Sequence, residues 1–430
     1  MALRGLTVLV EQLPLPIGSE VLIESTGVCG EIVGFAQGHA VVMLYGSSTG
    51  IRPGDRVRGG HAAPVAPISD LMLGRVVDAL GRPIDSGGVI SDTVLRPINA
   101  LPIGPMDRSP IEKPISTGVR AIDLMTTIGL GQRMGVFAGP GVGKSTLLGV
   151  IARRSSADVN VIGLIGERGR EVREFLDQSL GERGLARSVV VVATGDEPPL
   201  MRIRAAKLAC AIAEFFRDMG QNVLLMMDSV TRFAHAQRQV GLSVGEPPAT
   251  KGYTPSVFAE LPVLLERAGG VEATGGSVTG LYTILVEGDD MTEPIADAAR
   301  GILDGHLILS RKLAQRARYP AIDILDSLSR VADGIVDEQH RVARNHLRRL
   351  EAAYANIEEL VQIGAYAKGS DAEADVAVAY HDKIEELVRQ GIEDDTSPEQ
   401  AREWMLRLAM ESSELLHRLQ GGEPMVDARG

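Results

Sequence analysis

A glycine-rich stretch followed by a lysine and two hydroxyl residues is the strongest chemical signal in the sequence. It runs from Ala138 to Thr146. Glycines let backbone N–H groups wrap phosphate oxygens, and a helix that follows presents its positive end to them. In such a loop Lys144 reaches the β- and γ-phosphates, and the Ser145 hydroxyl ligates Mg²⁺. The residues expected to contact a nucleotide are Gly139, Pro140, Gly141, Val142, Gly143, Lys144, Ser145 and Thr146.

This stretch departs from the GxxxxGK[ST] pattern at one position. Ala138 stands where the pattern has its first glycine. Alanine is small enough for that turn, so the pattern still predicts a phosphate-binding loop with ATP and Mg²⁺ as ligands. The alternative is a glycine-rich turn that holds no nucleotide.

Two carboxylates follow buried strands of the predicted core and could complete a hydrolytic site. Asp228 ends the apolar run 223–227, where a carboxylate could hold Mg²⁺, although it could also cap the next helix. Glu167 lies just past the predicted strand 159–165, at the end where parallel sheets bind their ligands. It could orient or deprotonate an attacking water, or pair with Arg168 or Arg170.

Composition restricts the class of protein. The chain has 430 residues, 44% of them hydrophobic and 23% charged, which is typical of a folded protein of about three domains. The net charge of −12 argues against a surface that grips nucleic acid. Two distant cysteines fit a reducing cytosol, and no apolar run is long enough for a membrane helix. His235, His340 and His346 have no metal-ligand spacing, so we expect them to be solvated or hydrogen-bonded.

The elements that must position these residues fall into three regions. Short strands separated by turns predict a small β-barrel over residues 1–92. Residues 93–345 open with a proline-rich linker and continue with strands that alternate with helices, which predicts an α/β nucleotide-binding domain with a parallel sheet. Residues 346–430 carry apolar residues at intervals of three and four, which predicts a helical C-terminal domain, its last helix opened by Ser397 and Pro398.

Several longer motifs resemble a known family. They are GRVVDALGRP (74–83), GVRAIDLMTTIGLGQRMG (118–135), GERGREV (166–172), DEPPLMR (196–202), MMDSVTRFAHAQR (226–238), EPPATKGY (246–253), EGDD (287–290), DGHLILSR (304–311) and YPAID (319–323). Together they resemble the rotary ATPase α/β family over essentially the whole chain. The chain looks most like the flagellar protein-export ATPases, which are close to the virulence type III secretion ATPases. The resemblance implies a RecA-like core between the barrel and the helical domain.

The resemblance also implies roles for individual residues. Glu167 matches the catalytic glutamate of the family, and Arg168 matches an arginine beside the γ-phosphate. Tyr319 falls where an aromatic ring stacks on adenine, although ordinary core packing is the alternative. Arg330 matches the arginine finger that reaches the neighbouring subunit's site, with a surface ion pair as its alternative. Because one chain carries both faces of such a site, the resemblance implies a homohexamer.

The partners implied by the resemblance are those of an export machine. They are a regulator, a central stalk, an export gate at the inner membrane, export substrates and their chaperones, and no nucleic acid. The implied location is cytoplasmic, peripheral at the cytoplasmic face of the inner membrane. The turn 364–371, followed by Glu373 and Asp375, resembles the acidic tip that faces a stalk, although a solvated charged turn explains it equally well.

The leading hypothesis is an Mg²⁺-dependent ATP hydrolase that promotes chaperone release and flagellar protein export. TRFAHAQR and EPPATKGY look flagellar, and a virulence secretion ATPase is the alternative. A catalytic subunit of a rotary ATP synthase fits less well. A hexameric RNA translocase would need a basic cluster and several aromatic residues on the barrel. The barrel has no basic cluster, and its only aromatic residues are Phe35 and Tyr45. A nucleotide-binding scaffold without turnover conflicts with Glu167 and Lys144.

Overall fold

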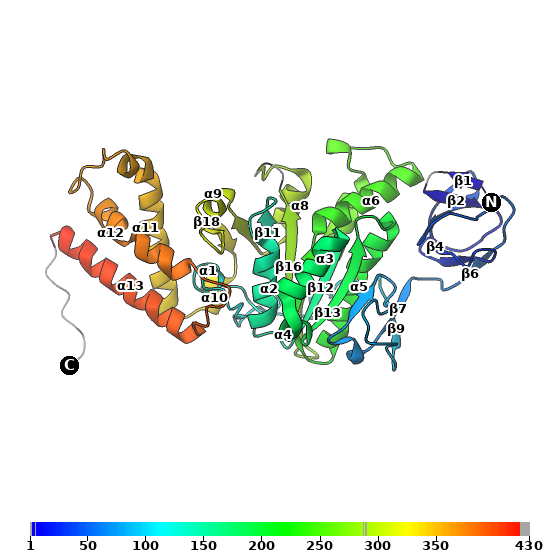
Figure 1. Ribbon diagram of the computed structural model, residues 1–430, viewed down its shortest axis with the longest axis horizontal. Coiled ribbons are helices and arrows are strands. Elements are labelled where there is room, and N and C mark those ends of the chain that lie inside the picture. Colours follow the sequence, from blue (N-terminus) through cyan, green and yellow to red (C-terminus); the bar gives the residue numbers. More distant parts are fainter. Residues whose placement is uncertain (1, 5, 287, 289, 422–430) are drawn as a thin grey trace. The chain divides into compact units, whose positions relative to one another are not determined.

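The computed structural model describes residues 2–4, 6–286, 288 and 290–421 (Figure 1). These residues form two compact units, each assembled from separate stretches of the chain. The first unit contains the described residues up to Pro110, with Leu130–Phe137 and Ala157–Leu303. The second contains Ile111–Gly129, Ala138–Ser156 and the described residues from Asp304 onward. Glu287 and Asp289 of the EGDD motif lie outside the described residues.

The N-terminal part of the first unit is a six-stranded antiparallel sheet. Its strands, in spatial order, are β1 (Ala2–Arg4), β2 (Thr7–Val10), β5 (His39–Leu44), β4 (Cys29–Ala36), β3 (Glu20–Ile23) and β6 (Val57–Gly59). Side chains alternate between the two faces of a strand, and one face of β2, β3, β4 and β5 packs into a common aliphatic core that includes Val8, Ile23, Ile32 and Val42. The expected barrel strands are thereby confirmed.

A second, two-stranded sheet follows, formed by β7 (Val65–Ile68) and β9 (Val94–Pro97). Between them lie the 3-10 helix η1 (Asp70–Met72) and the strand β8 (Val76–Asp78). The extended linker expected over residues 96–110 begins within β9 and contains the two-residue strand β10 (Arg108–Ser109).

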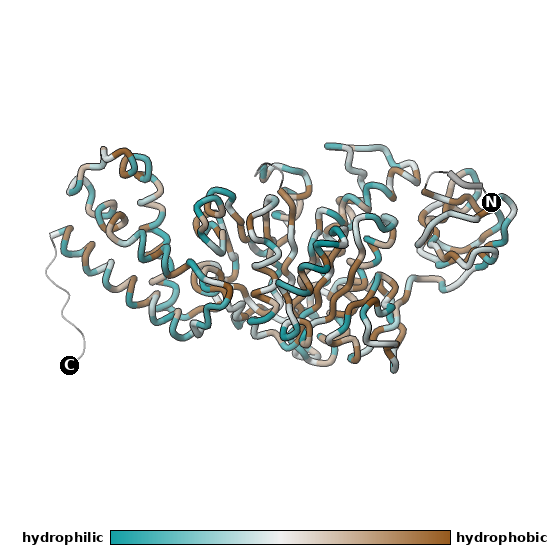
Figure 2. The backbone as a smooth tube through the Cα atoms, in the orientation of Figure 1, coloured by the Kyte–Doolittle hydropathy of each residue, from teal (hydrophilic) through white to brown (hydrophobic). Residues whose placement is uncertain are grey.

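The core of the first unit is the predicted parallel sheet. In spatial order its strands are β8, β13 (Ser188–Thr194), β12 (Val159–Glu167), β14 (Asn222–Asp228), β16 (Ser277–Leu285) and β11 (Arg133–Ala138), with β15 (Gly269–Val271) pairing antiparallel to β16 and β10. The pairs from β8 through β16 are parallel. Their residues are almost all buried, and Figure 2 shows hydrophobic colouring along them. Strands buried on both faces need such continuous apolar runs.

The first unit contains a set of helices. They are α3 (Gly169–Glu174), the π-helix Phe175–Leu180, α4 (Gly181–Leu185), α5 (Pro199–Asp218), α6 (Val230–Val244), the 3-10 helix η3 (Thr250–Gly252), α7 (Pro255–Leu265) and α8 (Pro294–Ile302). Helices α3, α4, α5, α6 and α8 contact the parallel sheet. Helix α5 contacts β12, β13 and β14, and lies beside α6 (Figure 1). The helical stretch 169–185 is divided, because the chain changes to π-helical hydrogen bonding at Phe175 and back to α-helical bonding at Gly181.

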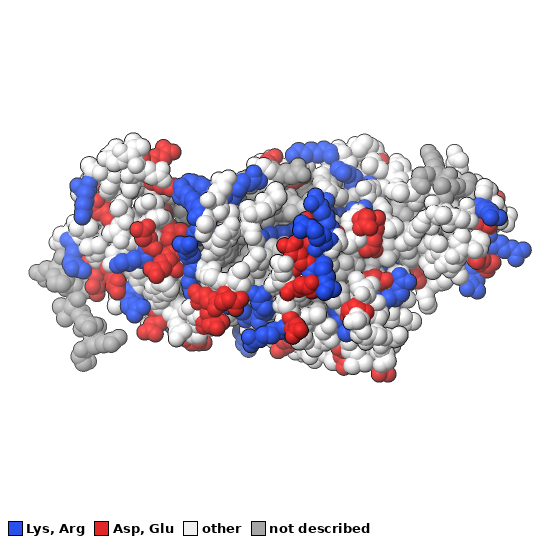
Figure 3. Space-filling view, in the orientation of Figure 1, with Lys and Arg blue, Asp and Glu red and all other residues white. Residues whose placement is uncertain are grey.

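The second unit joins short elements to three long helices. The short elements are α1 (Arg120–Met125), α2 (Lys144–Arg154), the antiparallel pair β17 (Gly305–Leu309) and β18 (Ile322–Ser329), α9 (Arg311–Gln315) and α10 (Ala332–Ile335). The long helices are α11 (Glu338–Gln362), α12 (Ala372–Val388) and α13 (Pro398–Leu419). They pack on one another, and Figure 3 shows positive and negative side chains interspersed on their visible face.

Side-chain caps fix the ends of these helices. Ser397 and Gln400 form a reciprocal capping box at the start of α13, as the sequence predicts. In the turn between α11 and α12, both carboxylate oxygens of Asp375 accept hydrogen bonds, from the Tyr366 hydroxyl and the Gly369 backbone N–H, each at 2.8 Å. Glu373 pairs with Arg349 at 2.8 Å. Both acids of the turn therefore have structural partners within their own unit.

Across the described part of the chain, no helix combines the length and apolar character needed to cross a membrane. The domain boundaries expected at 92/93 and 345/346 stay predictions.

Candidate active site

The predicted phosphate-binding loop connects a buried strand to a helix. β11 ends at Ala138, and α2 begins at Lys144. Gly141 and Gly143 have φ angles of 77° and 86°, a conformation that glycine adopts at little cost and that lets the loop turn into the helix. Lys144 and Ser145 therefore stand at the N-terminal end of α2, where the partial positive charge of a helix favours an anion.

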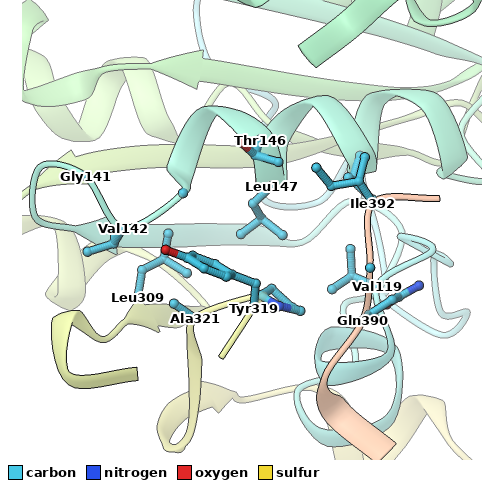
Figure 4. A pocket seen from close by; sticks show the side chains of 14 residues that line it. Val119, Gly141, Val142, Thr146, Leu147, Leu309, Tyr319, Ala321, Gln390 and Ile392 are labelled. Carbon is cyan, nitrogen blue, oxygen red and sulfur yellow. The ribbon is translucent and has the colours of Figure 1, made fainter. Parts of the chain in front are cut away.

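An apolar cavity of about 460 Å³ lies beside this loop within the second unit. It is lined by the loop, by the first turns of α2, and by segments that come from far along the chain. Figure 4 shows Tyr319 on one wall, with Val142 and Leu309 close by, and Ile392 and Gln390 entering from the segment after α12. The cavity combines the phosphate loop with a flat aromatic ring and aliphatic surface, which suits a planar base attached to phosphates.

Tyr319 is not an ordinary core residue. It is 43% exposed, and its ring lies close enough to Gly143 that a Cβ added there would be 3.4 Å from it. The backbone carbonyl of Tyr319 accepts a hydrogen bond from the Gln390 N–H at 2.9 Å. The Tyr319 side chain therefore lines the cavity beside the loop and is not buried in a core, and its stacking on a base stays a prediction.

The two candidate carboxylates lie at the carboxyl ends of neighbouring strands in the first unit. Glu167 is the last residue of β12 and Asp228 the last residue of β14. The parallel register pairs Asp228 with Leu164, three residues before Glu167. The structure therefore brings the ends of these two strands to the same edge of the sheet, which is where ligands bind in open α/β sheets.

Asp228 is 4% exposed and accepts a hydrogen bond from the Thr283 hydroxyl at 2.7 Å. It does not cap the following helix, because Ser229 is the N-cap of α6 and accepts from the Arg232 N–H. A carboxylate oxygen in this position is the kind of ligand that a divalent cation prefers.

The two arginines that follow Glu167 in the sequence form ion pairs with acidic residues of α3. Arg168 contacts Glu171 at 3.5 Å and Arg170 contacts Glu174 at 3.4 Å, both as exposed pairs along α3. Arg330 follows β18, and its side chain is exposed. No ion pair is found for the Arg330 side chain among the described residues, and its role as an arginine finger stays a prediction.

The residues present fit a nucleotide with a divalent cation. The loop offers backbone N–H groups and Lys144 to phosphates. Ser145 in the second unit and Asp228 in the first each carry an oxygen of the kind that Mg²⁺ prefers, and their joint role as metal ligands stays a prediction. The three histidines have hydrogen-bond partners, as expected: His235 with the Tyr253 hydroxyl, His340 with the Leu124 carbonyl and His346 with the Ser412 hydroxyl. The described residues contain no group of three or more histidine, cysteine or acidic side chains arranged to hold a metal.

Three family models match the chain. Residues 9–59 match the β-barrel domain of the ATP synthase alpha/beta family, and residues 118–329 match its nucleotide-binding domain. Residues 336–407 match the C-terminal domain of the type III secretion ATPase EscN.

Whole relatives extend this similarity. The "Flagellum-specific ATP synthase" of Pseudomonas aeruginosa is 48% identical over 404 residues, covering 93% of this chain and 90% of the relative. The "Type 3 secretion system ATPase" of Xanthomonas euvesicatoria is 54% identical over 360 residues, covering 84% and 81%. The solved structure of assembled EscN from enteropathogenic E. coli is 42% identical, covers 95% of this chain and 99% of its own, and has a TM-score of 0.89.

The chain belongs to the family of flagellar and type III secretion ATPases.

As a member of this family it is an ATP synthase-like ATPase that uses ATP. The match at 336–407 favours a secretion ATPase over a rotary ATP synthase subunit. The three-part fold expected from the sequence, with a barrel, a parallel-sheet nucleotide-binding domain and a helical end, is confirmed.

Sequence reasoning missed part of the cavity beside the loop. Val119 and Leu309 lie in motifs that carry the family resemblance but were not predicted to line a cavity, and Gln390 and Ile392 lie in no motif. Gln390 and Ile392 follow the loop by almost 250 residues, and only the folded chain brings them to it. The apolar run 307–309 could have suggested a strand, but not which cavity it lines.

Proposed function

We propose that this chain hydrolyses ATP at sites shared between identical subunits of a hexamer, and that hydrolysis promotes chaperone release and export of flagellar proteins. The observation that carries the proposal is the presence, in one chain, of a phosphate loop beside an apolar base-sized cavity together with Glu167, Asp228 and Arg330. The identity to flagellum-specific ATP synthases over nine-tenths of the chain supports it.

In this proposal the second unit binds the nucleotide. Backbone N–H groups of residues 139–146 surround the phosphates, Lys144 contacts the terminal phosphates, and the ring of Tyr319 stacks on the base. Ser145 and Asp228 hold Mg²⁺, which when bound neutralises charge on the phosphates. Each of these groups binds or orients, and none needs to change its covalent state.

The first unit supplies the group for turnover. Glu167, at the end of β12, orients the attacking water and accepts its proton, a role that typically contributes a factor of roughly 10² to 10⁴. Arg168 lies next to it in sequence and would stabilise charge on the γ-phosphate once its exposed pair with Glu171 opens.

The hexamer follows from Arg330. Its exposed side chain is proposed to enter the neighbouring subunit's site, where it offsets negative charge that develops as the phosphoryl group departs. Because this chain has both Glu167 and Arg330, identical copies can complete one another. EscN, to which this chain is similar, is known as an assembled ATPase and in complex with its central stalk EscO.

The wider setting is proposed from the same relatives. We place residues 1–92, 93–345 and 346–430 as barrel, ATPase and helical domains, and the protein at the cytoplasmic face of the inner membrane. Its proposed partners are a regulator, a central stalk, the export gate, and export substrates with their chaperones. The complex of EscN with EscO supports the stalk in particular.

Complementation tests the proposal. A flagellated bacterium that lacks its own export ATPase would receive this chain or its Lys144→Ala variant, and filament protein in the medium would be measured. We expect secretion with the wild-type chain and none with the variant at equal expression. Equal secretion by both would contradict the proposed use of ATP. Rescue of a virulence secretion system alone would assign the chain to that machinery.

A further inference from the structure

The nucleotide cavity is closed on one side by the segment between α12 and α13, residues 389–397. Gln390 and Ile392 of this segment line the cavity (Figure 4). The side-chain amide of Gln390 forms two hydrogen bonds. Its oxygen accepts from the backbone N–H of Arg120 at 2.9 Å, and its nitrogen donates to the Gly118 carbonyl at 3.0 Å. We call residues 389–397 the closing segment.

Arg154 ties the closing segment to the helix that starts at the phosphate loop. Its guanidinium donates to the backbone carbonyls of Ile392, at 2.8 Å, and Asp394. Its stem packs against Gly118, where an added Cβ would come within 2.4 Å of the Arg154 Cβ. Arg154 therefore contacts both the closing segment and the backbone that holds Gln390.

A second arginine holds the closing segment from the other side. Arg120 donates to the Leu387 carbonyl at 2.8 Å, to the Asp394 carboxylate at 2.7 Å and to the Thr396 hydroxyl at 3.0 Å. Burial alone would raise the pKa of Asp394, but hydrogen bonds from Thr396 and Arg120 hold it below its usual value. Arg120 is itself buried and lies over the Trp404 ring, so it also supports the C-terminal helices.

Helix α2 runs from the phosphate loop to the closing segment, so it connects the residues proposed to bind the phosphates with those proposed to contact the base. Helix α2 begins at Lys144 and ends at Arg154, a length of about 16 Å at 1.5 Å per residue. Its first end carries the lysine for the phosphates, its middle lines the cavity with Leu147 and Val150, and its last residue holds Ile392. The length of helix α2 thus sets the distance between the phosphate loop and the closing segment.

We propose that Arg154 is a positioning residue for base recognition: it fixes the closing segment at the distance from the phosphate loop that a nucleoside triphosphate requires. It does not touch the reacting atoms and acts through Ile392 and Gln390. This inference rests on the proposed nucleotide site. Arg154 is the better test than Arg120 because its ion pair, at 3.5 Å, is with the exposed carboxylate of Asp395.

The test compares a ligand that has a base with one that lacks it. Binding of ATP and of inorganic tripolyphosphate, each with Mg²⁺, would be measured by calorimetry on the full chain and on Arg154→Met. We expect ATP affinity to fall about tenfold, as loss of charged hydrogen bonds implies, and tripolyphosphate affinity to change less than twofold. In hydrolysis the KM for ATP should rise by the same factor, with kcat within twofold of wild type.

Three further variants control the experiment. Arg402→Met removes an Arg–carboxylate pair with Asp337 in the same unit and should change neither ligand. Tyr319→Ala, which removes the proposed stacking ring, should mimic Arg154→Met. If Arg154→Met does not fold, Arg154→Lys keeps the charge but not the two-pronged donor, and should weaken ATP binding selectively by a smaller factor.

Two results would overturn the inference. Equal loss of both ligands would show that Arg154 only supports the fold, and unchanged binding of both would show that the closing segment does not need it. Neither result would contradict the proposed function. A wild-type chain that binds neither ligand would instead contradict the proposed nucleotide site itself.

Discussion

In the function proposed for this ATPase, its two units supply different chemical groups. The second unit offers backbone N–H groups, one lysine and an apolar cavity walled by Tyr319 and Ile392. The first offers carboxylates at the ends of β12 and β14, with Asp228 buried and hydrogen-bonded to Thr283. Apolar surface and fixed N–H donors hold a ligand without changing it, whereas a carboxylate can accept a proton. Binding and turnover should therefore be separable by mutation.

The largest effect is expected from the second unit. Lys144→Ala removes the side chain proposed for the terminal phosphates, so ATP binding should fall by a factor of at least about 100, and hydrolysis should be lost. Calorimetry with Mg²⁺ and ATP measures the affinity. Lys312→Ala, which removes an exposed lysine paired with Glu358, is the matched control and should bind normally. Normal ATP affinity in Lys144→Ala would mean that the loop does not hold phosphates.

Arg330→Ala should separate assembly from binding. We expect the hydrolysis rate of the assembled protein to fall by a factor of roughly 10³ to 10⁵. The reason is that the negative charge developing on the phosphoryl group in the neighbouring subunit's site is no longer offset. ATP affinity at low protein concentration should stay unchanged. Steady-state hydrolysis across protein concentrations checks this, with Arg316→Ala, an exposed arginine paired with Glu358, as control. If the hydrolysis rate of Arg330→Ala rose on assembly as much as that of the wild type, Arg330 would not act in the neighbouring subunit's site.

Glu167→Gln should leave the binding unit intact and stop the first unit's contribution. The amide keeps the size of the side chain but cannot accept a proton, so hydrolysis should fall by roughly 10² to 10⁴ while ATP affinity stays within twofold. Single-turnover hydrolysis with pre-bound ATP measures the chemical step alone. Glu174→Gln, on the neighbouring helix α3, should be active. An ATP affinity lost together with the rate would contradict the division between the units.

The smallest effect concerns the stability of the first unit. Burial raises the pKa of Glu31 to about 7, although Arg204, Lys207 and the Tyr45 hydroxyl oppose this. Tyr45 donates to Glu31 at 3.3 Å, and Arg204 contacts both Tyr45 and Glu20, so this cluster joins the barrel to α5. Since the folded protein favours protonated Glu31, its contribution to stability is complete below the ordinary pKa near 4.5 and is lost as the pH rises through about 7.

Hydrogen–deuterium exchange of β3, β4 and β5 measures this loss. Between about pH 5 and pH 8, protection in the wild type, corrected for intrinsic exchange, should fall on the order of tenfold more than in Glu31→Gln. The Gln variant keeps the neutral form at every pH and so serves as the reference. Parallel loss of protection in both proteins would show that Glu31 does not titrate in this range.

The same contrast between the units explains what the sequence could predict. The parallel sheet was predictable because strands such as 159–165 and 223–227 must be apolar on both faces, and the phosphate loop because its chemistry depends on local spacing. The cavity was not, since Gln390 and Ile392 reach it only through the fold. Nor was the role of Arg154, whose backbone-carbonyl partners leave no mark on the sequence.

The most direct test of the central claim is Mg²⁺-dependent ATP hydrolysis by this chain alone across a wide range of protein concentration, with Glu167→Gln as control. We predict that specific activity rises with concentration in the wild type, because identical subunits complete each other's sites, and that the variant binds ATP but stays inactive. A pure chain that binds ATP yet hydrolyses none at any concentration would contradict the claim and indicate a missing partner subunit.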